Sequence, residues 1–461
     1  MQQAEEYNQK VVGQKLKTLD FLPENIKDLA NKFKDLKCQE IDLIAGQRFP
    51  ESVYDIICQA DNIPTELSLE WTKLQSMPTC AQECGVGIIH NHIIYTCGYC
   101  AGLYKGGSKN KKAVRGFSKA CFAFNLETNK WKKLPNFPGQ GRQGLRTTVL
   151  NNELYFWGGW TYQPMRAKQI NNIPSSQWPQ KKGVQTFSDG FKLSMNEEGD
   201  WVWSSLPPMP FPRTNFGICT DNKETIYICA GGHVLNGQMT SCTEFNTLYK
   251  ININDIESRW IKLDTFQGTM RINCSMAFVN DQIWILGGMF PNIKWKYQNT
   301  VVSRWRTSLD QWKYNVLDDK WSETTKNITE VSNWGGHDQI VFNNRYIILA
   351  GGSYFPEMVD CNNIVLQKLK PCLCHRLRVS HCACGNTFLD RIFAFDVLQQ
   401  KFIKSDVHLP GLINLPILKI YKDEIYILGG ESYSFTFKGE KFPRPHLDIC
   451  AKASISLPLS S

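Results

Sequence analysis

Short runs of alternating apolar residues recur along the chain, and five of them end in two glycines. The runs are LYFWGG (154–159), IYICAGG (226–232), IWILGG (283–288), YIILAGG (346–352) and IYILGG (425–430). An apolar run of this length, bounded by turn residues, predicts a buried β-strand. A sixth and less regular copy, IIYTCGY (93–99), keeps Gly98 and has Tyr99 where the second glycine would be.

A second apolar stretch and a polar turn precede each run. Examples are TTVLNNELYFWGG, MAFVNDQIWILGG and ILKIYKDEIYILGG. The Asn-Asn, Asn-Asp and Lys-Asp pairs are turn residues that join two antiparallel strands. We therefore predict a hairpin whose second strand ends at the glycines.

Two further strands follow each hairpin, and the last of them carries an aromatic residue. Trp131, Trp203 and Trp260 each stand three positions before a leucine, and Trp321 and Phe402 hold the aromatic position in looser copies. Each repeat is therefore predicted to contain four antiparallel strands.

This arrangement resembles the kelch repeat, in which a double glycine is followed at a distance by a tryptophan. The resemblance covers roughly residues 66–461 and implies one four-stranded propeller blade per copy. The alternative is a set of unrelated hairpins in a β-sandwich. Because six copies share one register, we expect an all-β, six-bladed kelch β-propeller.

The stretch EWTKLQSMP (70–78) indicates how the ring closes. Its Trp71, Leu74, Met77 and Pro78 repeat the spacing of the fourth strand that contains Trp203, yet no first three strands precede it. The last repeat has the opposite defect, since the chain stops after a third strand near 448–457. We expect this N-terminal strand to complete the last blade, which removes the exposed sheet edges.

Residues 1–62 differ from the repeats. In the segment 21–37, Ile26, Leu29, Ala30 and Phe33 are spaced as on one face of a helix, and Pro23 suits a helix start. We predict a short helical N-terminal extension over 1–62, followed by the propeller over 66–461.

The loops after the glycine pairs are long and basic. Successive pairs lie 56 to 78 positions apart, whereas a plain kelch blade takes about 50 residues. The segments after the six glycine motifs carry a summed charge of +15, against +9 for the whole chain. These loops open on one face of a propeller, so we predict a basic binding face.

Two groups on this face are candidate binding residues. The first group is three arginines just before innermost strands, Arg142, Arg213 and Arg271. They are predicted to point toward the central channel, where guanidinium groups suit carboxylates. The other interpretation is that they bridge neighbouring blades.

The second group lies in the segment 292–306, which interleaves cations with aromatics that can stack on sugars or peptides. The alternative is that the loop packs its own tryptophans. Its candidates are Lys294, Trp295, Tyr297, Arg304, Trp305 and Arg306.

The stretch KPCLCHRLRVSHCACGN (370–386) is rich in thiols and imidazoles. Cys372, Cys374, His381 and Cys384 could hold a structural zinc ion, although the C-x-C spacing differs from the usual C-x2-C. Free thiols are the alternative, and no other cofactor is predicted. A second group in 80–100 falls on strands of the first blade, where cysteine packs as a small apolar residue.

No H-E-x-x-H, G-x-S-x-G or Walker motif occurs. However, FPGQGRQGLRTTVLNNELYFWGGW (137–160) resembles a blade of the six-bladed kelch sialic acid mutarotases, which also close the ring with a displaced terminal strand. The resemblance implies a glutamate directly after a mid-chain glycine. This glutamate has no clear counterpart here, because Met289 follows Gly287 and Gly288. A glutamate does follow a glycine pair in the last blade, at Glu431.

We therefore hypothesise a non-enzymatic binding platform for an acidic protein or peptide. The alternative is a sugar-directed isomerase or lectin of the mutarotase kind, with an acidic sugar as ligand. Nucleic acid is disfavoured because 43 acidic residues are present and no known nucleic-acid module is visible. The sequence shows no membrane span or secretory signal, so we expect a cytoplasmic protein.

Overall fold

The computed structural model describes residues 69–100, 116–163, 182–235, 238–255, 259–297, 300–308, 310–324, 334–335, 338–354, 387–388, 392–403, 407–411, 413–432, 435–438, 440–442 and 446–455. Residues 62–357 and 388–461 form one compact unit. The predicted helical extension over 1–62 lies outside the described residues. Among the described helices, none is long and apolar enough to cross a membrane.

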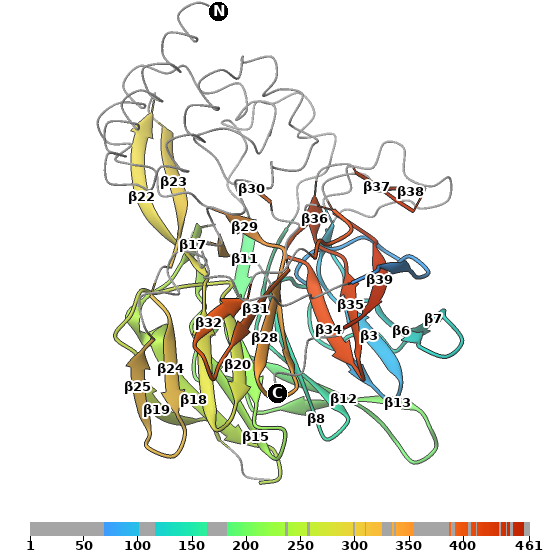
Figure 1. Cartoon of the computed structure of the whole chain (residues 1–461), viewed down its shortest axis with the longest axis horizontal. Helices are drawn as coiled ribbons and strands as arrows, with labels where there is room; N and C mark the ends of the chain where they lie inside the picture. Colours follow the sequence, from blue (N-terminus) through green and yellow to red (C-terminus); the bar gives the residue numbers. More distant parts are fainter. Residues whose placement is uncertain are drawn as a thin grey trace, which may run out of the picture. The chain divides into compact units, whose positions relative to one another are not determined.

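The unit is an all-β propeller of six four-stranded antiparallel blades (Figure 1). From the channel outward, the first three blades are β2 (Gly85–Ile89), β3 (His92–Thr96), β6 (Cys121–Asn125) and β7 (Lys130–Leu134); β8 (Arg146–Leu150), β9 (Glu153–Trp157), β12 (Gly190–Met195) and β13 (Trp201–Leu206); and β14 (Gly217–Thr220), β15 (Thr225–Cys229), β18 (Thr247–Asn252) and β19 (Ile261–Thr265).

The other three blades repeat the same order. They are β20 (Ser275–Val279), β21 (Gln282–Leu286), β24 (Trp312–Asn315) and β25 (Lys320–Glu323); β27 (Asp338–Phe342), β28 (Tyr346–Ala350), β31 (Ile392–Asp396) and β32 (Lys401–Ile403); and β34 (Ile417–Tyr421), β35 (Glu424–Leu428), β39 (Cys450–Ser454) and β1 (Thr72–Lys73). The innermost strands contact one another in a ring that runs from β2 through β8, β14, β20, β27 and β34 back to β2.

Short strands after the glycine motifs extend one face of the blades. They are β4 (Tyr99–Cys100) with β5 (Gly116–Phe117), β10 (Trp160–Gln163) with β11 (Lys182–Thr186), β16 (His233–Leu235) with β17 (Gln238–Thr240), β22 (Met289–Tyr297) with β23 (Thr300–Thr307), β26 (Trp334–Gly335) with β29 (Ser353–Tyr354), β33 (Ile413–Asn414) with β36 (Glu431–Ser432), and β37 (Phe435–Phe437) with β38 (Glu440–Phe442). A 3-10 turn, η2 (Thr243–Asn246), and the short strand β30 (Thr387–Phe388) complete the described elements.

The N-terminal strand completes the last blade, as the sequence predicted. In β1, Thr72 pairs with Lys452 of β39, and Lys73 pairs with Ala451. Backbone hydrogen bonds beyond the strand continue the contact, from Leu74 N to Cys450 O at 2.9 Å and from Met77 N to Asp448 O at 2.8 Å. Figure 1 shows the consequence, since the red strands β34 and β35 lie beside the blue β3 of the first blade.

The fourth-strand tryptophans explain why EWTKLQSMP could be recognised. The indole nitrogen of Trp131 donates to Gln75 O, and that of Trp203 donates to Pro135 O, both at 3.0 Å. Trp71 does the same to His408 O at 2.7 Å. Each of these bonds reaches the outer end of the preceding blade, so Trp71 occupies the position of its counterparts in complete repeats.

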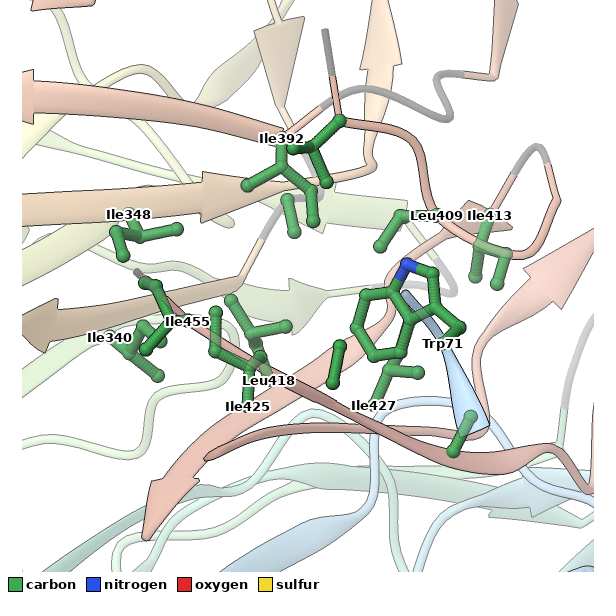
Figure 2. Close-up of a cluster of buried hydrophobic side chains, with 14 of the residues drawn as sticks. Trp71, Ile340, Ile348, Ile392, Leu409, Ile413, Leu418, Ile425, Ile427 and Ile455 are labelled. Carbon is green, nitrogen blue, oxygen red and sulfur yellow. The ribbon is translucent and has the colours of Figure 1, made fainter. Parts of the chain in front are cut away.

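Apolar clusters fill the spaces between neighbouring blades. The cluster between the fifth and sixth blades includes Trp71, Ile348, Leu418, Ile425 and Ile427, all at least 94% buried (Figure 2). Burial of large apolar side chains is the main favourable term in folding. The ring is therefore held by its inter-blade cores as well as by its sheets.

A pair of left-handed residues ends the second strand in all six blades. Their φ values lie between 56° and 67° at the first position and between 89° and 101° at the second. In the first and third blades the pair is Cys97-Gly98 and Ala230-Gly231, one position earlier than the expected Gly98-Tyr99 and Gly231-Gly232. The sequence alignment of these two copies was therefore wrong by one residue.

The second glycine of the pair joins neighbouring blades. Gly98 N donates to Arg142 O at 2.8 Å, and Gly159 N donates to Arg213 O at 3.0 Å. The same bond closes the ring, from Gly430 N to Ala81 O at 3.3 Å. A side chain is excluded at Gly430, because an added Cβ would lie 2.9 Å from Asn414 O.

Candidate functional site

The innermost strands surround a small polar cavity in the central channel. Its volume is about 60 Å³, and its lining includes Glu83, Arg146, Asp338 and Lys419 from four different blades. Lys419 Nζ lies 3.2 Å from Asp338 Oδ2, so these two charges form an ion pair. Glu83 and Arg146 are the remaining charged side chains of the described lining.

Local backbone geometry brings polar side chains to the rim of this channel. The residue two positions before an innermost strand adopts a left-handed conformation in four blades, at Glu83, Gly144, Asn215 and Asn273. Asparagine tolerates this conformation better than most residues. Backbone bonds then run from blade to blade, from Gly144 N to Glu83 O at 3.1 Å, Asn215 N to Gly144 O at 2.9 Å and Asn273 N to Asn215 O at 2.8 Å.

A side-chain network crosses the channel from Glu83 to Arg146. The Nδ2 group of Asn215 donates to Glu83 Oε1 and, at 2.6 Å, to Asn273 Oδ1. Arg146 Nη2 donates to the same Asn273 oxygen at 2.8 Å, and its Nε donates to Phe216 O at 2.9 Å. The third nitrogen, Nη1, makes no hydrogen bond to a residue that the structure describes.

The carboxyl group of Glu83 is held in its protonated form more strongly than an ordinary glutamate. Burial raises its pKa above 4.5, and the nearby charge of Glu431 raises it further. The Asn215 hydrogen bond and the charges of Arg146 and His446 act in the opposite direction but do not cancel the rise. A carboxyl group of this kind, next to a cation in a channel, is suited to proton transfer.

A second polar group lies where the last blade meets the first. We call the side chains of Gln82, Tyr99, Asn414, Glu431 and His446 the closure seam. Backbone bridges join Gln82 to Tyr99 and Glu431 to His446, and β33 places Asn414 opposite Glu431. Asn414 Nδ2 donates to Glu431 Oε1 at 2.7 Å, and the rings of Tyr99 and His446 meet edge-to-face with centroids 5.7 Å apart.

The three predicted arginines lie inside their blades. Arg142, Arg213 and Arg271 are at most 1% exposed. Arg142 forms a bidentate pair with Asp189, and Arg271 Nη2 lies 2.6 Å from Asp310 Oδ2. Their Nη1 groups donate to the first left-handed residue of the same blade, at Gly158 O and Gly287 O, both at 3.1 Å.

Arg213 lacks an acidic counterpart. Its Nη1 donates to Ala230 O at 3.2 Å, while Nε and Nη2 have no partner among the described residues. Burial lowers its pKa to about 10. The backbone carbonyls of Arg142 and Arg213 bridge neighbouring blades, so these residues have an internal role, and contact with a ligand stays a prediction.

The other sequence-predicted candidates can be placed only in part. Lys294, Trp295 and Tyr297 lie on β22, and Arg304, Trp305 and Arg306 lie on β23 of the same hairpin. The backbone pairs Trp295 with Val302 and Tyr297 with Thr300. The predicted zinc ligands Cys372, Cys374, His381 and Cys384 lie outside the described residues. Within the described part of the chain, no group of three or more His, Cys, Asp or Glu side chains could hold a metal ion.

Sequence reasoning missed Glu83, Arg146, Asn215 and Asn273. The available signal was positional: Glu83, Asn215 and Asn273 occupy the same place in the first, third and fourth repeats, two positions before the first strand. The sequence drew attention instead to the arginines two positions before Asn215 and Asn273. Glu431 had been noted after its glycine pair, but its proximity to Glu83 depends on ring closure.

Comparison with known proteins shows distant similarity to one enzyme group. The N-acetylneuraminate epimerases of Salmonella typhi and Salmonella typhimurium are both 23% identical to this chain over 151 residues, 32% of the chain. The match spans only 34% and 33% of those relatives. No family model matches the chain.

The fold has a solved counterpart. The structure of YjhT superposes with a TM-score of 0.54 at 14% identity, covering 83% of this chain and 99% of that one. The chain is thus a six-bladed β-propeller with the fold of YjhT, and it is distantly similar to N-acetylneuraminate epimerases.

Proposed function

We propose that the chain binds an acidic sugar in its central channel and interconverts the anomers of that sugar. The observation that carries this proposal is Glu83, a half-buried carboxyl group with a raised pKa that is linked to Arg146 through Asn215 and Asn273. The distant similarity to N-acetylneuraminate epimerases supports the choice of sugar. The propeller fold alone would not support this choice, because propellers host many different activities.

The chemistry requires one group that can both accept and donate a proton. Ionised Glu83 would take the proton of the anomeric hydroxyl group as the bond from the anomeric carbon to the ring oxygen breaks, and protonated Glu83 would then give that proton to the ring oxygen. Re-closure on the other face of the carbonyl reverses these transfers, so no proton is gained or lost. General acid-base catalysis of this kind is most effective when the pKa of the catalytic group is near the working pH.

Arg146 is placed to hold the sugar carboxylate. Its Nη1 group is unused within the described structure, while its two other nitrogens fix the orientation of the guanidinium plane. A fixed guanidinium favours carboxylates through charge-assisted hydrogen bonds. The ion pair of Asp338 and Lys419 leaves Arg146 as the unpaired cation of the described lining.

The test is the rate at which α-N-acetylneuraminate, released by a sialidase in the NMR tube, converts to the β anomer. We expect the wild-type chain to accelerate this conversion and Glu83→Gln to lose about a hundredfold of the acceleration. Glu197→Gln is the matched control, because Glu197 lies exposed in the turn after β12. Binding of the sugar without acceleration would support a lectin, and no binding would overturn the proposal.

The hypothesis of a binding platform for an acidic protein stays a prediction. Its loop candidates lie on β22 and β23, whose side chains beyond Met289 the structure does not describe.

A further inference from the structure

Two cysteines lie with their sulfur atoms in contact beside the closure seam. Cys80 Sγ is 3.2 Å from Cys100 Sγ, although the two residues are twenty positions apart in the chain. Both are reduced thiols, and each residue is 7% exposed. A disulfide holds its sulfurs about 2.05 Å apart. The two side chains therefore need to approach each other by only about 1 Å to be bonded.

The backbone beside the two cysteines fixes their contact. Gln82 and Tyr99 exchange two hydrogen bonds, from Gln82 N to Tyr99 O and from Tyr99 N to Gln82 O, both at 3.1 Å. Cys100 follows Tyr99 and pairs with Gly116 of β5. Cys80 precedes Gln82 by two positions, so this backbone bridge keeps the two thiols together.

The two cysteines are held by different blades. Met77 N and Ala81 N, on either side of Cys80, donate to the backbone carbonyls of 447–448 in the last blade, at 2.8 and 3.2 Å. Cys100 lies on β4, which extends the first blade. A bond between the sulfurs would therefore cross the joint at which the ring closes.

We propose that Cys80 and Cys100 form a reversible disulfide when the chain meets a peroxide, and that this bond holds the closing segment on the first blade. β1 ends at Lys73, seven positions before Cys80, and pairs with β39 through two residues only. With Cys80 bonded to β4, β1 stays near β39 while that pairing opens. The inference does not depend on the proposed function.

The oxidation balances with hydrogen peroxide as the oxidant. The thiolate of one cysteine attacks a peroxide oxygen, the O–O bond breaks, and a sulfenic acid and water form. The thiolate of the other cysteine attacks the sulfenic sulfur, the S–O bond breaks, and the hydroxide leaves as water. Two thiols and one peroxide thus become one disulfide and two waters.

The contact between the sulfurs favours the second of these steps, because the attacking thiol is already in place. Peroxide is the suitable oxidant because a small molecule can reach residues that keep 7% exposure. A thiol reductant restores the pair by exchange.

The test is peptide mapping of the native chain after exposure to hydrogen peroxide, with the remaining thiols trapped by iodoacetamide in urea. Trypsin and chymotrypsin together separate the sites, because Tyr95 and Tyr99 stand between Cys80 and Cys100. We expect two linked peptides that dithiothreitol separates. Fragmentation of the linked peptides distinguishes Cys80 from Cys84.

Thermal unfolding measures the role of the bond. The oxidised wild type should unfold about 4 °C above the reduced chain. Cys80→Ser and Cys100→Ser should each lose both the link and this increase, which also corrects for oxidation elsewhere in the chain. Cys97→Ala is the matched control and should keep both, because Cys97 is a buried thiol of the same blade and Ala230 holds its position in the third blade.

Three outcomes would overturn the proposal. The first is that Cys80 and Cys100 stay separate thiols in the peroxide-treated native chain. The second is that the link forms only when urea is present during oxidation. The third is a link that leaves the unfolding temperature unchanged, because such a bond would not hold the closing segment.

Discussion

Single residues in this propeller are constrained by bonds that the repeat pattern does not reveal. The second left-handed residue is glycine in every blade, because its φ lies between 89° and 101°, where other side chains are strained. The first position accepts Cys97 and Ala230. Two of the six copies are displaced by one residue when two glycines are taken as the signal, because the feature that recurs is the backbone conformation. Only glycine adopts it readily at the second position.

The buried arginines give a prediction for single substitutions. Although burial raises the pKa of Asp310, Arg271 and hydrogen bonds outweigh this and hold it below 3.8. Arg271→Met would leave this partly buried carboxylate without a cation, and we expect the substitution to lower the free energy of unfolding by about 3 kcal/mol. Arg213→Met removes the cation of no described carboxylate, so it should change the free energy of unfolding by less than about 1 kcal/mol. Urea denaturation of both variants compares them, and equal losses would contradict this account.

Glu83 gives a prediction for the pH dependence of stability. Because its pKa is raised in the folded chain, its contribution is fully present below about 4.5 and is lost as the pH rises through the folded value. Each unit of raised pKa corresponds to about 1.4 kcal/mol. The stability of Glu83→Gln relative to the wild type should therefore increase from pH 5 to pH 8.

Urea denaturation at several pH values measures this difference, with Glu197→Gln as the control. If the stability of Glu83→Gln relative to the wild type stays constant or falls as the pH rises, the pKa of Glu83 is not raised by burial.

At the scale of elements, closure depends on very little sheet. β1 has two paired residues, so the indole of Trp71 and its burial among Leu418, Ile425 and Ile427 supply much of the contact (Figure 2). This strand was predictable because the Trp, Leu, Met and Pro spacing is local. The channel network of Glu83, Asn215, Asn273 and Arg146 was not predictable from the sequence. It joins residues that precede or begin the first strands of four separate blades, and neither periodicity nor a motif connects them.

Trp71→Ala should therefore weaken the whole ring. We expect a loss of about 3–5 kcal/mol in the free energy of unfolding, as for other buried tryptophans. Trp203→Ala is the comparison, because Trp203 makes the same indole bond from a half-buried position, between two blades that are each continuous in the chain. A smaller loss at Trp71 than at Trp203, measured by urea denaturation, would mean that β1 does not hold the ring closed.

At the scale of the whole molecule, most of the cysteines that the structure describes are buried in the blades. All ten described cysteines are free thiols, and nine are buried. Burial raises the pKa of Cys97 and of Cys450 to about 12, which suppresses the reactive thiolate.

We expect iodoacetamide to modify Cys242 first among these ten in the native chain, because Cys242 is the half-buried one. Although burial raises its pKa as well, the reagent can reach it. Peptide mapping by mass spectrometry after brief exposure identifies the modified residues. Early modification of Cys84 or Cys450 would indicate that the blades open readily.

Closure by β1 also sets an order of events during synthesis. The seam takes Gln82 from the beginning of the propeller and Glu431 and His446 from its end. A ribosome that has translated five blades has therefore made Glu83 but not Glu431 and His446, whose charges act on it. β1 must wait unpaired until β39 leaves the exit tunnel, and only then can the ring close and bring Glu431 and His446 beside Glu83.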